Sequence, residues 1–221
     1  MAHRGTYGSV QIFYFQGSHL RYGFLIDTYE TERLKVMSVW AEFLDQDLPF
    51  RPHPTDRRGR SVLEHMVHQC LSEDAWFKNM LGVDVGARPL PETETRLAFV
   101  RQYAQDSRNR VDALRARPEA WWEEGVPFFE VRRSRAWILV RRIAHSAHHR
   151  GQQTALLRML GRSVHSTYGP SADTGGLGIH QAPTIYAYAD EAALLQGEAA
   201  GGRKAALPGP TPKAPTERPD V

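Results

Sequence analysis

Four long stretches of the chain place apolar residues at the spacing of one helical face. They cover about 27–45, a second stretch that begins at Ser61, about 94–116 and about 134–160. Each stretch can bury one side and leave the other in water, which is the pattern of an amphipathic helix. No stretch shows a convincing strand-like alternation, and nothing repeats internally. The sequence therefore predicts an all-α fold, a four-helix bundle.

Residues typical of helix ends lie at the borders of these stretches. Asp27 with Glu30, and Ser61 with Glu64, can each form a capping box, in which a short polar side chain and an acidic one satisfy each other's backbone N–H groups. Gly161 follows the last stretch in the position of a C-terminal cap. We expect the first, second and fourth helices to begin or end there.

The 221 residues suffice for one main domain with appendages. A long segment after the fourth helix is rich in turn formers but holds aromatic residues, so we expect it to pack on the bundle as a loop. The last residues contain five prolines and little to bury, which predicts disorder. The expected division is an N-terminal extension of unknown role at 1–24, the bundle at 25–162, the loop-rich segment at 163–196 and the tail at 197–221.

Composition excludes several classes of protein. The single cysteine, Cys70, rules out an internal disulfide framework and fits a reducing compartment. No apolar run approaches the roughly 18 residues of a membrane span, and the N-terminus lacks the apolar core of a signal peptide. We therefore expect a cytoplasmic protein without a membrane partner. The formal charge is only +3 and the arginines are scattered, whereas a nucleic-acid surface has clustered basic residues. We therefore expect no nucleic-acid partner.

Three histidines lie within five positions of the fourth predicted helix. His145 and His149 are four residues apart, so both rings lie on one helical face and can offer nitrogen atoms to one ion. His148 points to a neighbouring sector. Two ligands make half a site, because a catalytic metal centre usually takes three protein ligands and keeps a position open.

The second predicted helix offers His65 and His68 as the third ligand. His68 shares its helical flank with Leu71 and Ala75, whereas His65 shares its flank with polar residues. By position, this apolar flank favours His68. We expect His65 to be a supporting or surface group.

These two stretches together resemble the signature of the DinB/YfiT-like family of four-helix metalloproteins. The matching residues are His68, Glu73 and Trp76 in HQCLSEDAW, and His145 and His149 in HSAHHRGQ. The resemblance implies that the three histidines bind one divalent cation, with zinc or nickel favoured and iron or manganese as alternatives. The sequence STYGPSADTGGL is also similar to the C-terminal segment of some family members.

The resemblance implies a metal-dependent enzyme with a small-molecule substrate. The first interpretation is a thiol S-transferase-like activity, in which a low-molecular-weight thiol is activated and transferred to an electrophile. A hydrolase is an alternative, but HSAHH lacks the glutamate of HExxH metallopeptidases, and the candidate bases Glu64, Glu73 and Asp74 are not compelling. In the family pattern Glu73 can equally cap or brace a neighbour. A non-catalytic, stress-associated protein with a structural metal is the other alternative. In that case the segment YGPSADTGG would close the open coordination position or form a dimer contact. No catalytic or thiol-binding residue is assigned, so whether the chain is an enzyme is left open.

A few further expectations concern single residues. His53, His165 and His180 are expected to be ordinary loop residues. Trp76 is expected to anchor the core, Gly151 to allow close helix approach, and Gln152 either to orient a ligand or to make an ordinary interhelical hydrogen bond. The arginines near the histidines, Arg150 with Arg141 and Arg142, could bind carboxylates of an anionic thiol, although solvation at the surface is favoured. The family resemblance also leads us to expect a homodimer.

Overall fold

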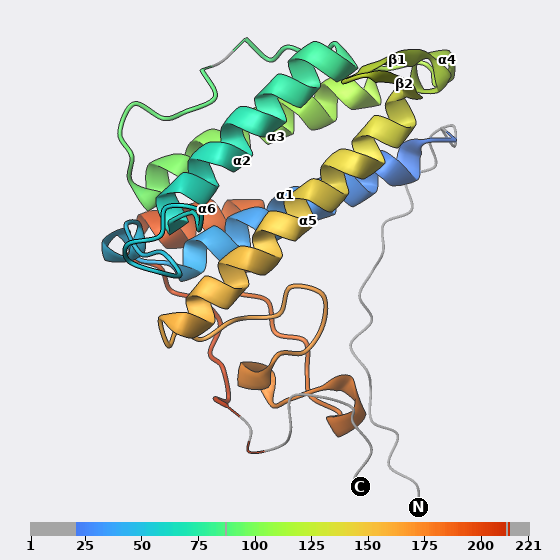
Figure 1. Cartoon of the computed structure of the whole chain (residues 1–221). Helices are drawn as coiled ribbons and strands as arrows, with labels where there is room; N and C mark the ends of the chain where they lie inside the picture. Colours follow the sequence, from blue (N-terminus) through green and yellow to red (C-terminus); the bar gives the residue numbers. More distant parts are fainter. Residues whose placement is uncertain (1–20, 87, 211, 213–221) are drawn as a thin grey trace, which may run out of the picture.

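A computed structural model describes residues 21–86, 88–210 and 212. Most of the predicted N-terminal extension, 1–20, and the end of the predicted tail, 213–221, lie outside the described residues. Four long helices build the body of the protein (Figure 1), and they are α1 (Gly23–Glu42), α2 (Val62–Trp76), α3 (Arg96–Arg115) and α5 (Arg135–Met159). The predicted all-α four-helix fold is confirmed.

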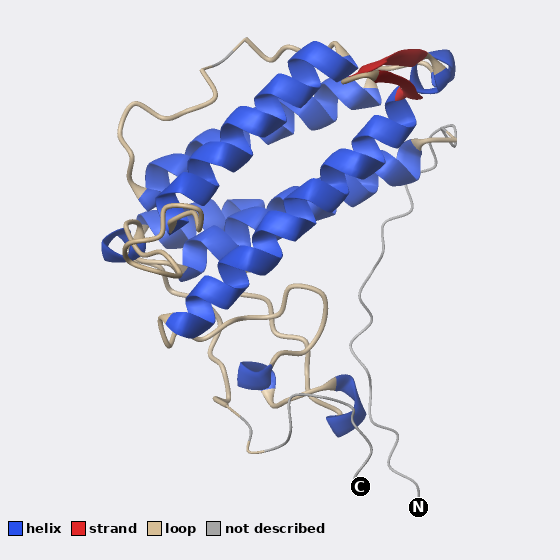
Figure 2. Cartoon of the chain, in the orientation of Figure 1, coloured by secondary structure: helices blue, strands red, loops and turns tan. Residues whose placement is uncertain are grey.

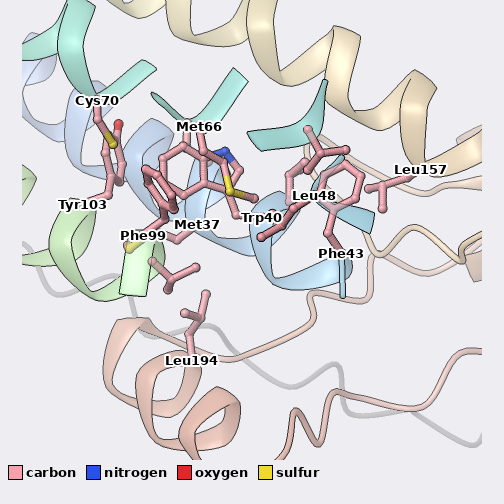
Figure 3. Close-up of a cluster of buried hydrophobic side chains, with 14 of the residues drawn as sticks. Met37, Trp40, Phe43, Leu48, Met66, Cys70, Phe99, Tyr103, Leu157 and Leu194 are labelled. Carbon is pink, nitrogen blue, oxygen red and sulfur yellow. The ribbon is translucent and has the colours of Figure 1, made fainter. Parts of the chain in front are cut away.

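The apolar faces of the four helices meet in two buried clusters. Helix α1 packs against both α3 and α5, and α2 packs against α5. In the first cluster Trp40 is fully buried among Met66, Phe99 and Leu194 (Figure 3). The second cluster lies toward the other end of the bundle and includes Phe77 and further apolar side chains. The bundle is thus held by ordinary apolar packing at two levels along its length.

Two of the three predicted capping signals are present. Ser61 Oγ accepts a hydrogen bond from Glu64 N, and Ser61 N donates to Glu64 Oε2 at 2.7 Å, so the predicted capping box starts α2. Gly161 adopts a left-handed φ of 67° just beyond α5, as a helix-ending glycine does. The capping box predicted for Asp27 and Glu30 is wrong, because α1 begins earlier, at Gly23, and has no side-chain cap.

A hairpin absent from the sequence prediction closes one end of the bundle. A short helix, α4 (Glu119–Glu123), leads into β1 (Gly125–Phe128), which pairs antiparallel with β2 (Val131–Ser134). These strands are the only ones in the described part of the chain (Figure 2). Each has four residues, which is too short for an alternating pattern to stand out. Phe129 in the turn has a φ of 51°, a conformation that a bulky residue rarely adopts.

The C-terminal segment packs on the bundle as expected but contains more structure. Two 3-10 turns occur at Ala172–Thr174 and Gly178–His180, and α6 (Glu191–Ala199) contacts α1 and α3. Residues 197–199, which we expected to be disordered, are the last turn of α6. Glu198 explains the difference, because this buried carboxylate pairs with Arg96 and Lys204. A composition-based reading does not detect such buried charge pairs.

His165, predicted as an ordinary loop residue, connects the end of α1 to the C-terminal segment. Its Nδ1 lies 2.6 Å from Glu42 Oε1, and its Nε2 lies 2.8 Å from the carbonyl oxygen of Ala205. Both partners are acceptors, so both ring nitrogens must carry protons. Burial disfavours the charged ring, but these two hydrogen bonds and the charge of Glu42 outweigh it and raise the pKa of His165.

No helix in the described ranges combines the length and the apolar character that crossing a membrane requires.

The raised pKa of His165 predicts a pH-dependent stability. The charged ring stabilises the fold fully below its unfolded pKa of about 6.5, and this contribution is lost as the pH rises through the higher folded pKa. Thermal unfolding measured between about pH 5.5 and pH 9 should therefore show a smaller decline with rising pH in His165→Gln than in the wild type. His53→Gln changes an exposed histidine and should keep the wild-type profile. Identical profiles for His165→Gln and wild type would contradict this prediction.

Candidate metal centre

Three histidines meet where α2 packs against α5. His68 belongs to α2, and His145 and His149 lie one turn apart on α5. One ring nitrogen from each lies within 4.8 Å of the others. His145 Nε2 and His149 Nε2 are 3.2 Å apart, and the ring centroids of His68 and His149 are 4.6 Å apart. The structure therefore brings together the three residues that we selected, and metal binding by them stays a prediction.

His65 lies beside this cluster without joining it. It is only 4% exposed, and its ring centroid is 5.5 Å from that of His149. The reason that we gave for preferring His68 was wrong, because Leu71 and Ala75 on its flank are exposed. His68 is half-buried, so it lies at the border between the bundle interior and solvent. A metal-ligating histidine at this border can leave one side of a bound ion accessible to solvent.

The histidines of the cluster are held in the neutral form. Burial lowers the pKa of His149 to about 3, and the charges of His145 and His68 add to the effect. Burial and the charge of Arg142 lower the pKa of His145 to about 4. Burial and the charge of Arg60 also lower the pKa of His68. Unprotonated imidazoles keep a free lone pair at neutral pH, which is the form that binds metal ions.

Gln152 orients the ring of His149. Its Oε1 lies 3.2 Å from His149 Nδ1, and its Nε2 lies 3.1 Å from His148 Nε2. If His149 Nδ1 donates to this oxygen, its Nε2 lone pair points toward His145. The contact agrees with the orienting role that was one of the two expectations for Gln152, and it lies within α5 rather than between helices.

Arg142 connects the histidines to the bundle interior. This side chain is fully buried, so the expected solvation at the surface is wrong for Arg142, and it is equally wrong for Arg150. Arg142 Nη1 lies 2.9 Å from Ser72 Oγ and 3.2 Å from His145 Nδ1. Its Nη2 lies 3.3 Å from a carboxylate oxygen of Glu73.

The Glu73 carboxylate is the centre of a buried polar network. It accepts hydrogen bonds from Tyr29 at 2.6 Å and from Tyr103 at 3.1 Å, and Arg110 Nη1 lies 3.3 Å away. Together with Arg142, these partners come from α1, α3 and α5, so the network joins them to α2, which carries Glu73. Glu73 therefore braces its neighbours, one of the two roles that the family pattern suggested.

The other two candidate bases are also engaged in structural contacts. Glu64 caps α2 and receives two hydrogen bonds of 3.0 Å from Arg51. Asp74 pairs with Arg110 at 3.2 Å. None of the three carboxylates considered from the sequence is left unpaired beside the histidines.

Aromatic side chains lie next to the cluster, and only Trp76 among them was named from the sequence. Trp76, which we expected in the core, is only half-buried and stacks on His145 with the ring centroids 5.6 Å apart. Phe128 and Phe129 of the hairpin lie 5.3 Å and 6.2 Å from Trp76, and Trp137 lies 5.1 Å from Phe128. Phe129 is 70% exposed and Trp137 is 41% exposed. We call these four residues the aromatic wall.

Two expectations about the surroundings of the cluster are not met. A Cβ atom added to Gly151 would have no neighbour within 4 Å, so this glycine does not serve close helix packing. The segment STYGPSADTGG was considered as a cover for the open coordination position. It lies instead on the side of α5 away from α2 (Figure 1), where residues 164–171 face Ala147, Gly151 and Thr154.

The Glu73 network yields a stability prediction. Glu73→Gln keeps the size of the side chain but removes the charge that Arg110 and Arg142 face. We expect a loss of about 3–5 kcal/mol in the free energy of unfolding, measured with urea, because the guanidinium groups stay buried without their counter-charge. Glu123→Gln, which breaks an exposed pair with Arg21, should change little. Equal stability of the two variants would count against the bracing role of Glu73.

The comparisons with known proteins concern the family and the fold. No curated protein matches the chain. A crystal structure of a DinB-like protein from Bacillus cereus is similar at 23% identity and a TM-score of 0.57, covering 66% of this chain and 96% of the other, which supports the fold. A DinB-like protein from Bacillus subtilis has 12% identity and a TM-score of 0.48, over 63% and 94%. The model of the DinB family matches residues 25–176, so the chain belongs to the DinB family.

Proposed function

We propose that this protein is a metal-dependent enzyme that transfers a low-molecular-weight thiol to an electrophilic small molecule. The observation that supports the proposal is the convergence of three neutral imidazoles from two helices, with ligand atoms within 4.8 Å. A divalent cation bound there would supply Lewis acidity, which lowers the pKa of a thiol or a water molecule.

The donor set fits such a cation. Imidazole nitrogens suit zinc and nickel, and iron or manganese are further candidates. His145 and His149 come from one rigid helix, and Gln152 holds His149 in place, so little ordering is needed when the ion binds. Because His68 is half-buried, one side of a bound ion would face solvent and could accept a substrate atom.

The arrangement of carboxylates favours a thiol over water as the nucleophile. Hydrolysis at a metal centre commonly uses a nearby base to take a proton from water. Glu73 is enclosed by Tyr29, Tyr103, Arg110 and Arg142 and is fully buried. A thiol is more acidic than water and is a strong nucleophile once deprotonated, so it needs no separate strong base.

The number of protein ligands also distinguishes the proposed catalytic metal from a purely structural one. Structural zinc sites are usually closed by four protein ligands, whereas three histidines make the candidate group in the described residues. The aromatic wall lies beside this group, with Trp76 stacked on His145. Planar apolar electrophiles could stack there, so we propose an aryl electrophile as the second substrate.

Metal content tests the first part of the proposal. Protein purified without chelator or an affinity-tag metal should carry roughly one divalent ion per chain by elemental analysis. His68→Ala, His145→Ala and His149→Ala should each lose most of it, because each removes a ligand. His148→Ala, on the same helix but outside the cluster, is the control and should keep its metal. Unchanged metal content in all three ligand variants would refute the site.

Activity tests the second part. The metal-loaded protein should accelerate the reaction of a thiol such as glutathione or cysteine with chlorodinitrobenzene, in which sulfur bonds to the ring carbon and chloride and a proton leave. His149→Ala should abolish this acceleration. Phe129→Leu should raise KM for the aryl substrate several-fold, because it removes a stacking interaction that contributes about 0.5–1.5 kcal/mol to binding. The metal content of this variant should not change. If metal-loaded wild-type protein does not accelerate the reaction, the proposed thiol transfer is refuted and the structural-metal alternative is favoured.

A further inference from the structure

A cavity lies on the other side of α5, between this helix and residues 164–171. Its volume is about 490 Å³, within the usual range for pockets that bind small molecules. Small and apolar residues form much of its lining, including Ala147, Gly151, Ala155, Val164 and Pro170. The cavity is therefore large enough for a compact organic ligand, and the exposed Gly151 and Ala155 show that it opens to solvent.

This cavity is separate from the histidine cluster. Gly151 follows His149 by two positions, which places the two residues about 200° apart around the helix axis. None of His68, His145 or His149 lines the cavity. A ligand bound there would contact the back of α5 and leave the metal ligands untouched.

Gly151 lies in the wall of this cavity, at an exposed position inside α5. A glycine inside a helix destabilises it by reducing helix propensity relative to alanine. Here nothing lies within 4 Å of the position that a Cβ atom would occupy, and the backbone has ordinary helical geometry. Close packing therefore does not explain the glycine. The missing side chain leaves free volume in the cavity wall.

The charged residues of the lining are all basic. They are Arg150, Arg158 and His165. The carboxylates that pair with them, Glu32, Asp173 and Glu42, do not line the cavity. Each cation is thus paired with a carboxylate outside the lining, and the charged groups that line the cavity itself are basic.

Two of these cations keep hydrogen-bond donors that the described residues do not use. Arg158 reaches Asp173 through Nη1 alone, so its Nη2 and Nε have no partner there. Arg150 is 1% exposed, and its Nε is buried without a partner, while its Nη2 contacts Glu32 and the hydroxyl of Tyr168. His165 has both nitrogens engaged and contributes charge only.

We propose that this cavity is a second ligand site, which binds a small organic anion with a compact apolar body and one carboxylate. The apolar body would lie over Gly151 and Ala155, and the carboxylate would accept hydrogen bonds from Arg158. This assignment does not depend on a metal or on the thiol-transfer reaction, because none of its residues belongs to the histidine cluster.

Hexanoate is a suitable probe, with hexan-1-ol as an uncharged match. Titration calorimetry with the full chain should show hexanoate binding at least tenfold more tightly than hexan-1-ol. Gly151→Leu fills the cavity and should abolish hexanoate binding. Gly151→Ala adds a methyl group into open space, so it should retain binding and raise the melting temperature. Arg158→Gln should weaken hexanoate binding at least tenfold and leave hexan-1-ol binding unchanged.

The outcomes separate this proposal from the proposed enzyme activity. Elemental analysis of Gly151→Leu should show wild-type metal content, because the histidines lie on the opposite face of α5. Failure of wild-type protein to bind hexanoate, or equal binding by wild type and Gly151→Leu, would overturn the second site. Equal affinity for hexanoate and hexan-1-ol would overturn its selectivity for anions. None of the three hexanoate-binding results bears on metal binding by the histidines.

Discussion

A single buried carboxylate holds the four long helices in register. Glu73 contacts Tyr29 of α1, Tyr103 and Arg110 of α3, and Arg142 of α5, while it belongs to α2. Burying a charge costs free energy unless partners surround it, so helix positions that separate these partners are disfavoured. Apolar packing alone tolerates small rotations and shifts of helices. The polar network specifies which packing is formed.

The same network fixes where the histidines lie. Arg142 contacts both Glu73 and His145, and Ser72 beside Glu73 also contacts Arg142. The orientation of α5 relative to α2 is therefore set a few residues from the cluster. Three rings that must point at a common centre need such support, because a displacement of about 1 Å disrupts the geometry of a site.

Helical spacing was sufficient for the four long helices and for the pair His145 and His149. His68 was selected with the help of the family resemblance, because its supposedly apolar flank is exposed. Ser61 and Gly161 marked helix ends correctly, since capping depends on local chemistry. The hairpin, α6 and the aromatic wall were missed. Each depends on contacts between segments far apart in the chain, such as Glu198 with Arg96 or Phe128 with Trp76, and local patterns do not report such contacts.

At Phe129, backbone stability and the proposed stacking of a substrate make opposite demands on one residue. Its left-handed backbone conformation costs of order 1–3 kcal/mol for a bulky side chain, whereas glycine would adopt it without strain. A glycine there would make the turn more stable but would remove the Phe129 ring from the aromatic wall. Selection for thermal stability would therefore favour glycine at this position, whereas selection for the proposed activity would favour phenylalanine. Directed evolution of the protein would meet this trade-off at the hairpin tip.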